Sequence, residues 1–309
     1  MLKYQVKKSI VIDAEPEQVQ QFVADFTQWP SWSPWLITEP DCPLVYSGDQ
    51  GSEGASYTWD GEIVGSGEMQ LVEVKPGTLN MDLRFLRPFK SQAKVGFEFD
   101  AVDGGCKVSW IMDSQVPWFL FFLKNLFKNM IGMDYDRGLG MLKAKIETGK
   151  VESKLSLLGD LTIDATHYVS LRGGATIEQM KEVMPGHIDS LTQLITEQKV
   201  VPNGPLFALY TKMDMNTSYS EFETCLPIES AVDLPEPFLV KQLPTTQAYA
   251  VEHTGSYNYL GNAWSMVMMA SRHYKVKTSK AILGMERFLD SPHTVAEGEL
   301  RTQVMVFKK

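Results

Sequence analysis

The sequence predicts an α+β protein built from two domains, and three observations support that prediction. The chain has 309 residues, which is long for a single hydrophobic core. From Cys42 to Met112, apolar and polar residues alternate between turn signals, a pattern typical of an antiparallel sheet. The second half repeats the order strand, helix, strand, strand. We expect domains at residues 1–150 and 160–309, with a linker at residues 151–159.

Composition and charge indicate an ordinary globular chain. The hydrophobic fraction of 44% and the charged fraction of 22% argue against disorder. The formal net charge of −9 is spread over both halves, so neither offers a basic face and we expect no direct nucleic-acid partner. Cys42, Cys106 and Cys225 show no C-x-x-C spacing, which favours buried thiols in a reducing compartment over disulfides or a zinc site.

The N-terminal segment shows no targeting signal. Residues 1–13 alternate like a strand and lack the apolar centre of a signal peptide. The longest apolar run, Val116–Leu123, is far shorter than the roughly 20 residues of a spanning helix. We therefore expect a cytoplasmic protein without membrane insertion.

The elements of the first half follow the order strand, helix, antiparallel sheet, long helix. Tyr4–Ile12 is predicted to be a strand, and Pro16 opens the first helix. The long helix carries an amphipathic stripe formed by Tyr135, Leu139, Leu142 and Ile146. This order predicts a helix-grip arrangement, in which the long helix closes over the sheet.

Tryptophans and glycines indicate how this domain packs. The segment Trp29–Trp35 contains three tryptophans at three-residue spacing, and we favour a core plug over a cofactor or sugar platform. Gly132, Gly138 and Gly140 each weaken the closing helix by about 1 kcal/mol relative to alanine. They therefore indicate a close approach by the sheet or by a ligand, and we favour the sheet.

The aromatic run Phe119–Leu123, followed by Lys124 and Lys128, allows two interpretations. It could touch a membrane surface, or it could form the buried start of the closing helix. We favour burial, because the neighbouring residues are not otherwise basic.

Several segments of this half resemble a known superfamily. Ser9–Ala14, Trp29–Trp35, Asp136–Leu139 and Leu142-Lys143 are similar to the SRPBCC (START-like, polyketide-cyclase-like) superfamily, over about residues 1–150. The resemblance implies a deep hydrophobic cavity between the sheet and the last helix. The superfamily includes lipid carriers, cyclases and co-chaperone-type domains, so the resemblance implies a fold and no single chemistry. The aromatic residues expected at that cavity, or in the core, are Trp59, Phe85, Phe97 and Trp110.

The second half is predicted to contain two β-α-β-β units. The first unit comprises strand Leu161–Leu171, a helix at about Thr176–Gln198, and strands Leu206–Met213 and Tyr219–Leu226. The second comprises strand Phe238–Thr254, a helix at about Tyr257–Tyr274, and strands Ala281–Asp290 and Glu299–Phe307. Two such units side by side place both helices on one face of a joined sheet and leave the other face free to curve around a ligand. A break is expected in the first helix at Pro185.

The strand Ala281–Asp290 places one carboxylate on an apolar face, where Glu286 lies between Gly284 and Phe288. Inside a closed pocket, an unpaired carboxylate has its pKa raised by up to about 3–5 units. A cation about 4 Å away removes that penalty, since the attraction is roughly 4 kcal/mol at an effective dielectric near 20. Glu286 is therefore our candidate anchor of a ligand site. The alternatives are an edge-strand glutamate in water or an ion pair with Arg287 or Arg301.

Aromatic residues are expected around this carboxylate. Alternation turns Tyr168 toward the free face, and Tyr210 lies on the strand that corresponds to that of Glu286. Aromatic faces attract cations by about 2 kcal/mol or more once desolvated, which favours a bulky cationic or amphipathic organic ligand. The predicted ligand-binding residues are Glu286, Tyr210, Tyr168, Phe288, Tyr257 and Trp264.

The second half also resembles a family, the GyrI-like small-molecule-binding domain, over about residues 155–309. The resemblance rests on Asn203–Tyr210, Glu252–Tyr257, Met285–Asp290 and Arg301-Thr302. The domain is shared with gyrase-inhibitor proteins and with effector-binding domains of AraC- and MerR-type activators. The resemblance implies that Glu286 matches the family's pocket glutamate and Tyr210 a pocket-wall tyrosine. Arg287-Phe288 replaces the usual tyrosine after the glutamate.

The sequence contains no clear catalytic or cofactor motif. The five histidines lack metal-binding spacing, and neither a dinucleotide fingerprint in its proper context nor a G-x-S-x-G elbow is present. We therefore expect no metal, no cofactor and no catalytic residue. GyrI-like domains resemble a group in which the pocket glutamate activates water against strained electrophilic rings. A hydrolase would thus use Glu286 as general base and Tyr210 as its partner.

The resulting hypothesis is a small-molecule binder that sequesters, carries or senses hydrophobic or cationic compounds, without a DNA-binding domain of its own. Two alternatives stay open. One is a hydrolase that acts at Glu286, and the other is a gyrase-inhibitor-like or co-chaperone-like module with a protein partner.

Overall fold

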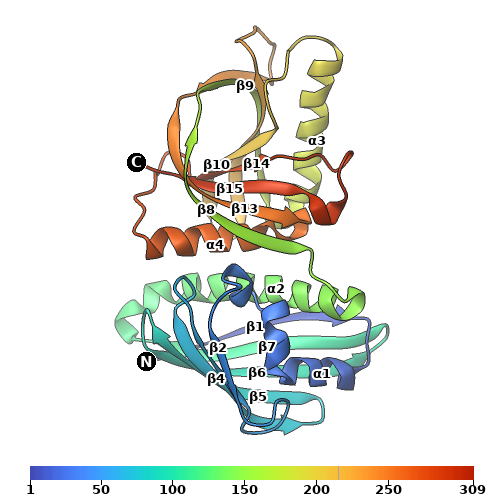
Figure 1. Ribbon diagram of the computed structural model, residues 1–309, viewed down its shortest axis with the longest axis vertical. Coiled ribbons are helices and arrows are strands. Elements are labelled where there is room, and N and C mark those ends of the chain that lie inside the picture. The colour runs from blue at the N-terminus through green and yellow to red at the C-terminus, as the bar shows by residue number, and fades with distance from the viewer. Residues whose placement is uncertain (215) are drawn as a thin grey trace. The chain divides into compact units, whose positions relative to one another are not determined.

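The computed structural model describes residues 1–214 and 216–309, except for the side chain of Leu120. The chain forms two compact units, Met1–Val151 and Glu152–Lys309 (Figure 1). Each unit contains one antiparallel sheet with helices packed on it, so the predicted α+β class is confirmed.

The first unit contains a seven-stranded sheet in the order β1-β7-β6-β5-β4-β3-β2. Its strands are β1 (Leu2–Ile12), β2 (Leu44–Ser47), β3 (Ser56–Asp60), β4 (Ser66–Lys75), β5 (Thr78–Arg87), β6 (Ser91–Val102) and β7 (Gly105–Val116). Its helices are α1 (Pro16–Ala24) and α2 (Lys124–Thr148), with 3-10 turns η1 (Phe26–Ser31), η2 (Leu36–Thr38) and η3 (Trp118–Leu123). Strands β2 to β7 pair in chain order and α2 packs along β1 and β7, so the expected meander and helix-grip arrangement are confirmed.

The tryptophan segment lies in the core of this unit. Trp29 and Trp32 are fully buried, and the ring of Trp29 packs edge-on against Trp110 at a centroid distance of 6.0 Å. Trp110 in turn stacks on Tyr135 of α2 at 4.0 Å, with 12° between the ring planes. The predicted core plug is therefore confirmed, and these rings occupy the space between the sheet and α2 at that level.

Two glycines of α2 differ in what surrounds them. A Cβ added at Gly138 would lie 2.7 Å from Cζ3 of Trp110 and 2.9 Å from Cδ of Pro34. A Cβ at Gly140 would meet nothing within 4 Å. The close approach of the sheet, which we expected at these glycines, thus holds for Gly138 and not for Gly140.

This difference predicts opposite effects for the same substitution on one helix. We expect Gly138→Ala to destabilise the protein by about 1–3 kcal/mol, because the methyl group displaces a closely packed indole. Gly140→Ala should instead stabilise it by about 0.5–1 kcal/mol, through the higher helix propensity of alanine. Denaturant unfolding of both variants measures the two changes, and equal values would contradict this account of the core.

The expectation of burial for Phe119–Leu123 is wrong at three of its positions. Phe119, Phe121 and Phe122 are exposed, as is the preceding Trp118. These residues form η3, a short 3-10 turn that follows the end of β7. Because η3 precedes α2 at the end of the sheet, these four aromatic side chains project beyond the core. The side chain of Leu120 lies outside the description.

The second unit contains an eight-stranded sheet in the order β12-β9-β11-β10-β14-β15-β13-β8. Its strands are β8 (Ser153–Ile163), β9 (Thr166–Thr176), β10 (Phe207–Asp214), β11 (Tyr219–Ile228), β12 (Leu239–Leu243), β13 (Thr246–Gly255), β14 (Gly284–Phe288) and β15 (Arg301–Phe307). Its helices are α3 (Ile177–Thr196) and α4 (Leu260–His273), with 3-10 turns η4 (Tyr257–Tyr259) and η5 (Glu297–Glu299). The repeated units are β9-α3-β10-β11 and β13-α4-β14-β15, which confirms the predicted duplication. Each is preceded by a strand, β8 or β12, that pairs with the other unit.

Four details of this half differ from the sequence prediction. Residues 153–159 belong to β8, and alternation did not reveal the strand because a bulge interrupts its pairing with β13 near Leu158 and Gly159. Predicted strand Leu161–Leu171 is a hairpin of β8 and β9, and Phe238–Thr254 is divided into β12 and β13. Helix α3 continues through Pro185 instead of breaking there.

The two faces of the eight-stranded sheet have different partners. On one face, α3 packs on β9 and β11, while α4 packs on β13 and β15. The sheet curls around the other face (Figure 1). The expectation that this face is free for a ligand is wrong, because the face holds a buried hydrophobic cluster that includes Tyr168, Phe207, Leu209, Met285 and Met305.

No helix in the described part of the chain combines the length and the hydropathy that crossing a bilayer requires.

Candidate functional site

The candidate site lies on the two central strands of the second unit. Strands β10 and β14 pair antiparallel with Leu209 opposite Met285, so Ala208 faces Glu286 and Tyr210 faces Gly284. In the duplicated fold, Tyr210 and Glu286 therefore occupy equivalent positions on the two strands. Their side chains lie on the helix-bearing face, where Tyr210 belongs to a buried cluster that Met180 and Met184 of α3 and Trp264 of α4 pack against.

Glu286 is a buried carboxylate held by two neutral donors. Only 5% of the residue is exposed. The hydroxyl of Tyr210 donates to Oε2 at 2.8 Å, and Nε1 of Trp264 donates to Oε1 at 2.6 Å. Burial raises the pKa of Glu286, and the two hydrogen bonds offset only part of that rise. Both carboxylate oxygens thus accept hydrogen bonds, and no charged partner compensates them within the part of the chain that the structure describes.

Both alternative roles considered for Glu286 are contradicted. Strand β14 is central, so Glu286 is not on an edge in water. The guanidinium of Arg287 donates to Gln303, while that of Arg301 pairs with Asp290 at 2.8 Å. Among the residues that the structure describes, no lysine or arginine forms an ion pair with Glu286.

A second buried glutamate in the same sheet provides a contrast. Glu223 of β11 is 7% exposed, and its Oε1 lies 2.5 Å from Nζ of Lys241 and 3.4 Å from Nε of Arg172. Burial raises the pKa of Glu223, but the hydrogen bond and the charge of Lys241, with Ser170 and Arg172, bring it below its ordinary value. Of these two buried glutamates, Glu223 is paired with basic side chains, whereas Glu286 has only neutral hydrogen-bond donors among the described residues.

Gly284 explains how Trp264 reaches the carboxylate. A Cβ at Gly284 would lie 2.6 Å from Cη2 of Trp264 and 2.5 Å from the carbonyl oxygen of Met305. Since glycine has no side chain, the indole can lie directly on β14, from where Nε1 contacts Glu286 two residues along the strand.

Half-buried aromatic side chains continue from this centre. The ring of Trp264 packs edge-on against Tyr210 at 5.4 Å, and that of Phe288 packs against Tyr257 at 5.6 Å. Phe288 belongs to the same cluster as Tyr210 and Trp264. The structure thus joins Glu286, Tyr210 and Trp264 directly, and brings Phe288 and Tyr257 beside them.

Tyr168 does not join this group. It lies on the opposite face of the sheet, where its ring packs edge-on against Phe207 at 5.4 Å. Sequence reasoning instead missed Phe222, which is paired with Tyr210 across β10 and β11 and has its ring 6.1 Å from that of Tyr210. The alternation of Tyr219–Leu226 places Phe222 on one face of its strand, but only the pairing of β10 with β11 shows that this face is the one that carries Tyr210.

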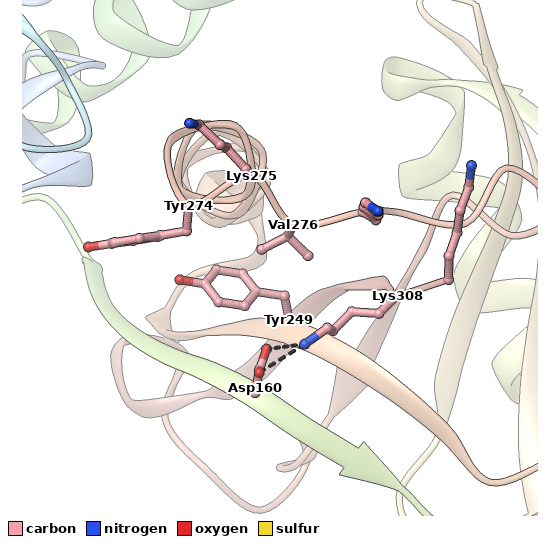
Figure 2. Close-up of a pocket in the computed structure, with 8 residues that line it drawn as sticks. Asp160, Tyr249, Tyr274, Lys275, Val276 and Lys308 are labelled. Atoms are coloured by element: carbon pink, nitrogen blue, oxygen red, sulfur yellow. Dashed lines mark hydrogen bonds and ion pairs between the residues drawn. The ribbon is translucent and has the colours of Figure 1, made fainter.

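A surface pocket on the same unit does not contain these residues. Its volume is about 580 Å³, and Figure 2 shows Lys308 paired with Asp160 beside Tyr249 and Tyr274. Lysines 275, 277, 308 and 309 line it, so its charge does not favour an organic cation. Among the described residues, no group of three His, Cys, Asp or Glu side chains could hold a metal ion.

Comparison with protein families assigns each unit. Residues 3–147 match the family described as polyketide cyclase / dehydrase and lipid transport. Residues 161–306 match the GyrI-like small molecule binding domain. The chain is therefore a fusion of an SRPBCC-type domain with a GyrI-like small-molecule-binding domain. A search of the curated proteins found no match.

Solved structures resemble single parts of the chain. The C-terminal domain of EcmrR is 15% identical, with 51% of this chain and 98% of that chain covered and a TM-score of 0.43. The Aha1 dimer from Colwellia psychrerythraea is 16% identical, with 48% and 99% covered and a TM-score of 0.37. A protein from Chromobacterium violaceum is 15% identical, with 46% and 96% covered and a TM-score of 0.36.

Proposed function

We propose that the second unit binds an organic cation with an apolar body, and that Glu286 supplies the opposing charge. The observation that carries this proposal is the uncompensated burial of Glu286 between Tyr210 and Trp264. A positive charge near the carboxylate would replace the missing counter-ion. The match of residues 161–306 to a small-molecule-binding family supports a ligand at this unit.

The aromatic side chains supply the rest of the binding surface. Trp264 is half-buried and contacts Glu286, so a ligand that reaches the carboxylate displaces its indole or stacks on it. The rings of Phe288 and Tyr257 then pack against the apolar body of the ligand. Cation–π attraction to these faces adds to the charge interaction with Glu286.

Binding is better supported here than hydrolysis. Both carboxylate oxygens of Glu286 already accept hydrogen bonds, and only 5% of the residue is exposed. Displacement of Trp264 by a ligand would free Oε1 for the cation of the ligand, whereas a general base would need that oxygen for a water molecule as well. We therefore assign the chain to the sequestration, carriage or sensing of lipophilic cations.

Tetraphenylphosphonium and the neutral triphenylphosphine oxide test this proposal, because they share aromatic bulk and differ in charge. In calorimetric titrations of the whole chain, we expect the cation to bind and the neutral compound to bind at least about tenfold more weakly. Equal affinity for both compounds would show that charge does not determine recognition.

The affinity for tetraphenylphosphonium should also rise with pH. The pKa of Glu286 is above its ordinary value of 4.5, so below that raised pKa the carboxyl is neutral and attracts a cation weakly. Binding should strengthen as pH rises through it and level off above. Glu286→Gln should lose this rise. His187 is a second titratable group near the site: its ring lies 6.0 Å from that of Phe222, and burial lowers its pKa. Comparison of Glu286→Gln with the double variant Glu286→Gln/His187→Gln separates the contribution of His187 from that of Glu286.

A further inference from the structure

Exposed aromatic residues gather at one end of the first unit. Trp118, Phe119, Phe121 and Phe122 of η3 are 57–72% exposed, and Phe89 between β5 and β6 is 82% exposed. We call these five residues the aromatic patch. Monomeric soluble proteins rarely expose apolar groups in such number at one place, and those that do use them for contact with a partner or a membrane.

Strand pairing places these segments together. Leu2 at the start of β1 pairs with Val116 at the end of β7, and Lys94 near the start of β6 pairs with Asp113. The β5–β6 connection that carries Phe89 therefore lies at the same end of the sheet as η3 and the N-terminus. Figure 1 shows the N-terminus and the beginning of α2 at that end.

The segments that carry the aromatic patch are basic, although the whole chain is acidic. The net charge of the protein is −9, yet the β5–β6 connection and residues 114–133 contain Lys90, Lys124 and Lys128 and no acidic residue, and Lys3 lies at the start of β1. Other cations at this end pair with acids on neighbouring strands, as Lys94 does with Asp82 and Arg87 with Asp60. Among the described residues, Lys3, Lys90, Lys124 and Lys128 have no ion-pair partner.

From this combination we infer that the aromatic patch docks the first unit on an anionic lipid surface. Tryptophan and phenylalanine enter the boundary between headgroups and acyl chains, while the four lysines lie against the anionic headgroups. Contact is peripheral and orients this end of the sheet toward the bilayer, since acids elsewhere on the chain are repelled. Self-association through the patch is disfavoured, because a two-fold contact would bring the lysines of both copies together.

Sedimentation of the whole chain with vesicles tests this inference. We expect binding to phosphatidylcholine vesicles that contain about 30 mol% phosphatidylserine, and weaker binding to phosphatidylcholine alone or at high salt. Trp118→Ser with Phe121→Ser should lower the affinity for the anionic vesicles at least about tenfold, and Lys124→Gln with Lys128→Gln should lower it less. Val45→Ser with Val72→Ser, which alters two exposed valines of β2 and β4, should leave it unchanged.

A conservative variant provides a second readout. Trp118→Phe should keep most of the vesicle binding but lose most of the fluorescence quenching by brominated lipids, since the indole of Trp118 is the one that enters the bilayer. Three results would overturn the inference. They are no binding of the unaltered chain to anionic vesicles, equal binding by the Trp118→Ser/Phe121→Ser variant, or a dimer that this variant converts to a monomer.

Discussion

Glu286→Gln should weaken the binding of tetraphenylphosphonium by about 2–4 kcal/mol, or about 30- to 1,000-fold. The substitution removes the charge and preserves the shape. The amide oxygen can accept the hydrogen bond from Trp264, and the amide nitrogen can donate to the hydroxyl oxygen of Tyr210. Loss of affinity would therefore report the charge of Glu286 and not the collapse of its surroundings.

Glu223→Gln is the matched control for this measurement. It removes a second buried carboxylate of the same sheet, one that is already paired with Lys241. We expect its affinity for tetraphenylphosphonium to stay within about threefold of that of the unaltered chain. Similar losses in both variants would mean that the cation responds to the overall charge of the unit, and the assignment of Glu286 would fail.

The same two substitutions should affect stability differently, because only Glu223→Gln should be destabilising. The pKa of Glu286 is raised in the folded protein, so above the pKa of an unfolded glutamate its ionisation opposes folding. Glu286→Gln should leave the ligand-free chain as stable at about pH 7, or more stable by about 1–2 kcal/mol. This gain should fade as pH falls toward about 4, where the carboxyl is protonated in both states.

Glu223→Gln should instead destabilise the protein. Its pKa is lowered, so its stabilisation is present above the pKa of an unfolded glutamate and is lost as pH falls through the folded value. We expect the free energy of unfolding to fall by about 1–3 kcal/mol at about pH 7. The exposed Arg172 contributes little to this loss, because solvent screens its charge. Thermal unfolding of both variants at about pH 7 and pH 4 shows whether each substitution stabilises or destabilises the protein. A destabilising Glu286→Gln at the higher pH would contradict the absence of a compensating charge.

Much of the fold could be predicted because local pattern and strand order agree. The meander of β2–β7 follows from alternation between turn residues, and the two repeated units follow from helices α3 and α4 between strands. What could not be predicted was β8, because a bulge near Gly159 disturbs its alternation. The exchange of β8 and β12 between the repeats depends on long-range pairing, which local sequence does not express.

The same limit applies to the candidate site. Gly284 and Glu286 could be placed on one face from alternation within a strand, and the family resemblance drew attention to Tyr210. The face that Tyr168 occupies relative to Glu286 depends on how β9, β11, β10 and β14 pair, and the structure places them on opposite faces. The position of Trp264 required the fold as well, because its contact with Glu286 comes from the packing of α4 on the sheet.

Exposure of the aromatic patch shows a different limit. A run of aromatic residues followed by lysines is compatible with a buried helix start and with a surface. The deciding fact is that η3 lies at the end of the sheet, after β7 has finished and before α2 begins to pack. That fact depends on where two elements end, and element ends are the least predictable feature of a sequence.

The central claim is that Glu286 is buried without a counter-charge until a cationic ligand supplies one. A carbon-13 NMR titration of the glutamate carboxyl groups, with the Glu286 signal assigned by its absence in Glu286→Gln, measures this directly. We predict a pKa above 4.5 in the ligand-free chain and a lower pKa when tetraphenylphosphonium is bound. A ligand-free pKa at or below 4.5, or no change on addition of the cation, would contradict the account.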